Sequence, residues 1–206
     1  SDCGPIPQYA DASAKRRHGA AEGWPAPPIP SALVPPVATS TAGPTLGLED
    51  ELAALDPHHW NLRSIDVDQV RRDEPRLENH ASKEFHACVL ELKTGVHASA
   101  QAAVDELRLL RQRGAGAALN QGLRLAALAV HPFARWQDAT VHSDPATDPH
   151  YARLLQAHGD IARSMLTFGL HVHVGLSDPD ARARLFNLVR EFIPVFTALS
   201  AAAPFW

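Results

Sequence analysis

Three short segments alternate polar and apolar side chains, and this pattern limits the possible folds more than any other feature of the chain. The segments are TLGLEDELAAL from Thr45, HACVLELKTG over 86–95 and FGLHVHVG over 168–175. Successive side chains of a β-strand point to opposite faces, so such alternation predicts strands with one apolar and one polar face. The sequence therefore predicts a β-sheet that carries charged groups on one of its faces.

Helices are predicted between and after these strands. Apolar residues at helical spacing predict a helix over 98–117, a third strand is expected over 123–131, and a second helix over 149–166. A last, long helix should begin after a cap at Ser177 or Asp178 and bend at Pro194. This order predicts an α+β fold, with an antiparallel or mixed curved β-sheet and helices packed on one face.

The first 44 residues differ in composition from the rest of the chain. Nine of the 17 prolines lie there, among many Ala, Ser and Gly residues. Such a segment buries too little apolar surface to offset its ordering entropy, which predicts a disordered Pro/Ala-rich tail over 1–44 and a folded domain over 45–206. The alternative is a polyproline II ligand over 25–36 that docks on an aromatic groove of another protein.

Overall composition excludes several classes of partner. Hydrophobic residues make up 45% of the chain, the net charge is -4 and the pI is about 6.3, which gives no reason to expect nucleic acid or an anionic membrane. No apolar stretch reaches the roughly 18–20 residues that span a bilayer. With only two cysteines, the chain suits a reducing, cytoplasmic compartment.

The first strand places Glu49 and Glu51 on one face, opposite Leu48 and Leu52. Carboxylates about 7 Å apart repel each other unless a cation is near. For this pair taken alone, a solvated strand face is the favoured interpretation, and a cation site is the alternative.

The last strand repeats the arrangement, with His171 and His173 on the face opposite Val172. The bordering glycines, Gly169 and Gly175, suggest that something approaches this face closely. Histidines on strands are often only hydrogen-bonded, so both a structural and a ligand role stay open.

In the middle strand, Glu91 lies between two leucines and needs a partner, for which Lys93 on the same face is the candidate. If the three strands share a sheet, Glu49, Glu51, Glu91, His171 and His173 share its polar face. Oxygen ligands with one histidine suit Mg²⁺ or Mn²⁺, and protein-bound Mg²⁺ usually accompanies phosphates. No P-loop or G-x-G-x-x-G motif occurs, so those nucleotide-binding modes are not supported.

Five motifs in order resemble one family. TLGLEDEL, LELKTGV, HPFARW, FGLHVHVG and LSAAAPFW, spread over about 45–206, are similar to the type-2 glutamate–cysteine ligases, also called carboxylate–amine ligases. The resemblance implies a partial glutamine synthetase-like catalytic fold, in which a curved antiparallel sheet holds divalent metals and ATP on its concave face. It implies that Glu49, Glu51 and Glu91 are catalytic and, with His171, bind metal.

The implied reaction is an ATP-dependent ligation in the cytoplasm. ATP phosphorylates the γ-carboxylate of glutamate, and the amine of cysteine or another amino compound attacks the resulting acyl phosphate. ATP and Mg²⁺ or Mn²⁺ would be the cofactors. Metals would neutralise charge on the transferred phosphoryl group.

Arg135 and His173 are the candidates for substrate binding. Arg135 could contact a substrate carboxylate or phosphate. It could equally be a surface charge beside a buried Phe133 and Trp136, and this structural interpretation is favoured.

Family members extend well beyond the PFW motif, so the chain is expected to be the N-terminal half of a ligase catalytic domain. The alternatives are a truncated, inactive fragment that binds metal or nucleotide, and an interaction domain that uses the Pro-rich tail. A half-sheet should leave a strand edge and apolar helix surface exposed, which predicts low solubility or assembly with another chain, such as a homo-oligomer.

Overall fold

The computed structural model describes residues 43–203, all within one compact unit. The proposed tail and its polyproline segment lie outside these residues, apart from Gly43 and Pro44. The elements, in chain order, are β1 (Thr45–Leu55), α1 (Val67–Asp73), the 3₁₀ turn η2 (Pro75–Leu77), β2 (Ala81–Lys83), β3 (Val89–Lys93), α2 (Ala100–Asn120), β4 (Arg124–Ala126), the 3₁₀ turn η3 (Trp136–Asp138), α3 (Pro149–His158), α4 (Asp160–Ser164), β5 (Leu170–Gly175), α5 (Pro179–Arg190) and α6 (Ile193–Leu199).

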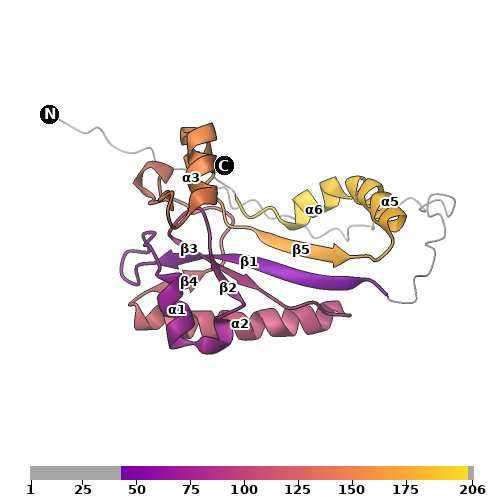
Figure 1. Ribbon diagram of the computed structural model, residues 1–206, viewed down its shortest axis with the longest axis horizontal. Helices are drawn as coiled ribbons and strands as arrows, with labels where there is room; N and C mark the ends of the chain where they lie inside the picture. Colours follow the sequence, from indigo (N-terminus) through magenta and orange to yellow (C-terminus); the bar gives the residue numbers. More distant parts are fainter. Residues whose placement is uncertain (1–42, 204–206) are drawn as a thin grey trace, which may run out of the picture. The chain divides into compact units, whose positions relative to one another are not determined.

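Strand β1 is the centre of a five-stranded sheet in which every pairing is antiparallel (Figure 1). One edge of β1 pairs with β3, which in turn pairs with β2. The other edge is shared, because β5 pairs with Thr45–Asp50 and β4 with Ala53–Leu55. The expected α+β fold with an antiparallel sheet is confirmed.

Helices α1 and α2 cover one face of the sheet and enclose the main core (Figure 1). Ser99 caps α2 by accepting a hydrogen bond from the backbone N–H of Ala102, as expected of a serine at this position. Leu52, Leu90 and Leu92 point into this core from β1 and β3. Asp50 points to the same side, where its carboxylate is buried and pairs with Arg111 of α2 at 2.6 Å.

The opposite face of β1 and β3 therefore carries the acidic side chains. The apolar part of this face is a smaller cluster at the end of β1 and the start of β3, where Ala53 and Val89 pack against Leu166 and Phe168. These residues leave the middle of the face to Glu49, Glu51 and Glu91. The covered and polar faces expected from the alternation are confirmed.

Several expected element boundaries were wrong. The helix expected over 149–166 is two helices, because Gly159 between them has φ +53°, a conformation that costs residues with a Cβ. The strand expected over 123–131 is only Arg124–Ala126.

The long C-terminal helix is also two helices, α5 and α6. Asp178 caps α5, as one of the two expected candidates. The break falls before Pro194, which lies in the first turn of α6, where its missing N–H has no intrahelical partner to lose.

No helix among the described residues is both long and apolar enough to cross a bilayer.

Candidate functional site

Glu49 stands at the middle of the acidic face, between residues of two neighbouring strands. Its backbone partners are Lys93 on β3 and His171 on β5. One carboxylate oxygen, Oε2, lies 3.3 Å from Nδ1 of His171 and 3.1 Å from Nε2 of His173. The other, Oε1, lies 3.6 Å from Nζ of Lys93. The antiparallel register thus surrounds one carboxylate with three basic groups.

These contacts hold Glu49 in its ionised form. Partial burial alone would raise the pKa of Glu49, but the hydrogen bond from His173 and the charges of Lys93 and the two histidines outweigh it and lower the pKa. The carboxylate is therefore ready to act as an anionic ligand at neutral pH.

Glu91 is the buried member of the site. Only 5% of its surface is exposed, and its Oε2 accepts a hydrogen bond of 2.6 Å from the hydroxyl of Ser82. Nζ of Lys93 lies 2.8 Å from the same oxygen. The expected pairing of Glu91 with Lys93 is confirmed.

Glu51 has fewer favourable contacts. Its backbone partner across the sheet is Glu91 itself, and its Oε2 accepts the backbone N–H of Gly169 at 2.7 Å. Burial raises the pKa of Glu51, and the carboxylates of Glu84 and Glu91 add to this, while the Gly169 N–H opposes it. An added cation would relieve this repulsion.

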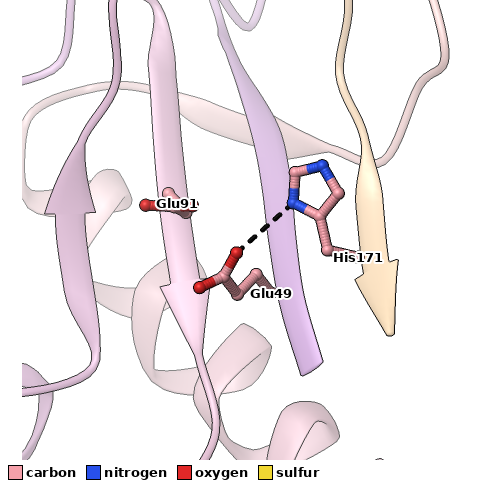
Figure 2. A group of neighbouring side chains, drawn as sticks. All are labelled: Glu49, Glu91 and His171. Carbon is pink, nitrogen blue, oxygen red and sulfur yellow. Dashed lines mark ion pairs between the residues drawn. The ribbon is translucent and has the colours of Figure 1, made fainter. Parts of the chain in front are cut away.

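Within residues 43–203, two overlapping groups of acidic and histidine side chains lie close enough together to hold a metal ion. Single donor atoms of Glu49, Glu91 and His171 lie within 4.8 Å of one another, and so do those of Glu51, Glu84 and Glu91. Figure 2 shows the first group, with Glu49 joined to His171 and Glu91 on the neighbouring strand. Carboxylate oxygens with one imidazole fit Mg²⁺ or Mn²⁺.

The net negative charge of Glu49, Glu51, Glu84 and Glu91 also favours the binding of a divalent cation. Among residues 43–203, the ion pairs made by the four carboxylates are with Lys93, His171 and His173, and they involve only Glu49 and Glu91. A group of four acidic side chains with one permanent cation is costly unless further positive charge binds. The residues present fit a divalent ion.

Glu84 belongs to this group although no pattern in the sequence indicates it. It lies between β2 and β3 in an irregular segment, where no alternation marks the face to which a side chain points. Its spacing of seven residues from Glu91 gives no strand or helix signal by itself. Only the folded loop brings its carboxylate to Glu51 and Glu91.

His173 and Arg135, the two candidates for substrate binding, lie in different surroundings. His173 borders a cavity of about 400 Å³ that also touches Glu49, Asn79 and Lys93. Arg135 is exposed, makes two hydrogen bonds to Asp138 at 3.0 and 3.2 Å, and lines a separate cavity. The structure thus brings His173 to the acidic face and places Arg135 in another cavity.

The segment around Arg135 also differs from expectation. Phe133 is 60% exposed instead of buried, and Trp136 is only partly buried. The residue of HPFARW that is buried is His131, whose Nε2 lies 2.8 Å from the carbonyl oxygen of Trp60. This contact fixes the loop and leaves the phenyl ring of Phe133 outside.

The amino-acid sequence of the chain is similar to those of known ligases. The model of Glutamate-cysteine ligase family 2 (GCS2) matches residues 45–206. Putative glutamate–cysteine ligase 2 of Solibacter usitatus is 37% identical over 163 residues, covering 79% of this chain and 41% of that protein. The protein of the same description from Gloeobacter violaceus is 34% identical over 177 residues, covering 83% and 45%. The chain thus spans less than half the length of these relatives.

Two solved structures share the fold at low sequence identity. Glutamate–cysteine ligase from Francisella tularensis, in complex with AMP, aligns with a TM-score of 0.53 and 17% identity, over 73% of this chain and 30% of that one. A bifunctional glutathione synthetase from Pasteurella multocida aligns with a TM-score of 0.50 and 19% identity, over 73% and 19%. Because the family model matches residues 45–206 and the two relatives are 37% and 34% identical over 79% and 83% of this chain, the chain belongs to the glutamate–cysteine ligase family 2.

Proposed function

We propose that this chain forms part of an ATP-dependent carboxylate–amine ligase and carries its metal-binding face. The observation that carries the proposal is the convergence of Glu49, Glu91 and His171 from three strands, in a member of a glutamate–cysteine ligase family. Residues 45–206 would correspond to the N-terminal half of the catalytic domain. The AMP bound to the related ligase supports a nucleotide as one substrate.

The proposed reaction joins the γ-carboxylate of glutamate to the amine of cysteine or another amino compound. A carboxylate oxygen attacks the γ-phosphorus of ATP, and the bond to ADP breaks to give an acyl phosphate. The amine nitrogen then attacks the acyl carbon, loses a proton and expels inorganic phosphate, which leaves an amide. No side-chain nucleophile is required for either step.

The residues of this face would act by positioning and electrostatics. Glu49, Glu91 and His171 would hold one divalent ion, and Glu51 and Glu84 with Glu91 a second. Such ions supply positive charge to the phosphoryl group during transfer. The strands hold their ligands at fixed spacing, so little reorganisation would be needed when ATP binds.

His173 is the proposed substrate contact at this face. It borders the cavity beside Glu49, and its imidazole already donates toward that carboxylate. Arg135 is a second proposed contact, to a substrate carboxylate or phosphate, although its guanidinium would first have to leave Asp138.

Isothermal titration of ATP with Mg²⁺ into the chain tests the proposal. Glu49→Ala and His171→Ala should abolish binding. The exposed residues Glu78 and His58 provide matched controls, and Glu78→Ala and His58→Ala should bind as the unaltered chain does. Equal binding by all five proteins would contradict the assignment of the site.

A coupled assay of ADP release with glutamate and cysteine then separates two functions. Turnover that requires both amino acids supports a ligase. Binding of nucleotide without turnover by this chain favours the alternative, a metal- and nucleotide-binding chain, which the group of Glu49, Glu91 and His171 would support equally well.

A further inference from the structure

Lys93 occupies the position between two of the carboxylates that would bind the metal. It is the last residue of β3, and its Nζ lies 2.8 Å from Oε2 of Glu91 and 3.6 Å from Oε1 of Glu49. Both glutamates belong to the same group of possible metal ligands. A divalent ion bound by that group would therefore compete with the Lys93 ammonium group for the same carboxylate oxygens.

The Lys93 side chain can move more easily than the Glu91 carboxylate that it contacts. The Glu91 carboxylate is buried, and Ser82 holds the oxygen that Lys93 contacts. The Lys93 side chain is 40% exposed and has a flexible four-carbon stem. It also borders the cavity of about 400 Å³ beside Asn79 and His173, which offers space for its ammonium group. When a metal ion arrives, the lysine can move while the carboxylate stays.

Charge repulsion prevents the Lys93 ammonium group and a divalent metal ion from occupying this position at the same time. Like charges a few ångströms apart in a partly buried site repel strongly, and a divalent ion brings twice the charge of an ammonium group to the same oxygens. Without metal, the ammonium group offsets the repulsion between Glu49 and Glu91. With metal, the same ammonium group becomes unfavourable where it lies.

We propose that Lys93 is an exchangeable counter-ion of the metal site: its ammonium group keeps Glu49 and Glu91 together before the divalent ion binds, and leaves them when it does. This inference rests on the proposed function, because it assumes that these carboxylates bind metal. It makes Lys93 a positioning residue that lowers the apparent affinity for metal and keeps the metal-free site assembled.

Titration of Mn²⁺ alone into chelator-treated chain tests the exchange. Lys93→Met should bind Mn²⁺ at least about tenfold more tightly than the unaltered chain, because the competing charge is gone. Lys93→Arg keeps that charge and should stay close to the unaltered chain. Lys83→Met is the matched control, because Lys83 pairs with Asp68 at 2.9 Å and should leave the affinity unchanged.

Thermal unfolding in EDTA gives a second measurement that does not depend on metal affinity. Lys93→Met should melt at a lower temperature than the unaltered chain, and saturating Mn²⁺ should remove most of the difference. Circular dichroism at low temperature verifies that the variant is folded.

The outcomes separate this inference from the proposed function. Equal Mn²⁺ affinity in the unaltered chain and in Lys93→Met, with loss of binding in Glu49→Gln, would overturn the exchange and leave the metal site standing. No Mn²⁺ binding by any of these proteins would overturn both.

Discussion

At the scale of single residues, alternation along a strand was sufficient to place most of the site. The shared face of Glu49 and Glu51, opposite Leu48 and Leu52, follows from a period of two residues. The same rule put His171 and His173 on the polar face of their strand and paired Glu91 with Lys93. Alternation could not find Glu84, because a loop residue has no period. The burial expected for Phe133, which also lies in a loop, was wrong.

His86 gives a prediction about pH at this scale. Its side chain is buried, and Nε2 lies 3.0 Å from the carbonyl oxygen of Arg163. Burial lowers the pKa of His86 despite that hydrogen bond and the nearby charge of Glu84. As the pH falls below about 6.5, the unfolded chain takes up a proton that folded His86 resists, so this residue makes stability fall with pH.

His86→Gln should therefore lose less stability between pH 7 and pH 5 than the unaltered chain does, although it should be less stable at pH 7 by about 1–3 kcal/mol. Urea unfolding at several pH values measures this slope. His58→Gln serves as the control, because its exposed imidazole meets water in both states, and its slope should match that of the unaltered chain. An unchanged slope in His86→Gln would show that the burial of His86 is unimportant for the pH dependence.

At the scale of elements, the type and order of the strands and helices could be predicted but their register and breaks could not. The alternation in FGLHVHVG indicates a strand, yet nothing in it says that this strand pairs with β1 and so brings His171 opposite Glu49. That pairing joins residues 122 positions apart and depends on the whole sheet. The break at Gly159 was missed because helical periodicity continues on both sides of it.

The packing of α2 on the sheet leads to a prediction with its own control. A Cβ on Gly114 would lie 3.4 Å from methyl carbons of both Leu90 and Leu92, whereas a Cβ on Gly116 would meet nothing within 4 Å. Gly114→Leu should destabilise the chain by about 1–3 kcal/mol, because the helix must move off the core. Gly116→Leu should stabilise it by about 0.5–1 kcal/mol through helix propensity.

Denaturant unfolding of the two variants measures both effects. Similar changes in the free energy of unfolding for the two leucines would mean that α2 does not pack against β3 through Gly114.

At the scale of the whole molecule, the apolar surface of β5, α5 and α6 stands out. Most of the large apolar side chains of α5 and α6 are exposed in the structure, and the apolar face of β5 is exposed as well. This agrees with the expectation of uncovered helix surface. The large exposed apolar side chains of these elements are Leu170, Val172, Val174, Phe186, Leu188, Val189, Phe192, Ile193, Val195, Phe196 and Leu199.

Polar substitution on this surface should raise solubility at little cost in stability. Phe186 is 72% exposed and Val172 is 61% exposed. Phe186→Ser combined with Val172→Thr should increase the concentration at which light scattering detects aggregates, and should change the free energy of unfolding by no more than about 0.5 kcal/mol per site. Leu90→Ala is the contrast, because Leu90 is fully buried and its loss should cost about 2–5 kcal/mol. A cost of that size at Phe186 would mean that its ring is covered.

The proposed metal site joins Glu49, Glu91 and His171 on the face shared by β1, β3 and β5. The most direct measurement is the NMR spectrum of the imidazole protons during addition of substoichiometric Mn²⁺, which broadens signals close to the bound ion. The signals of His171 and His173 should broaden first, while those of His58 and His59, in the loop after β1, stay sharp. Glu49→Gln should remove the effect. Broadening that is equal for all histidines, or first at His58 and His59, would contradict the proposed metal site.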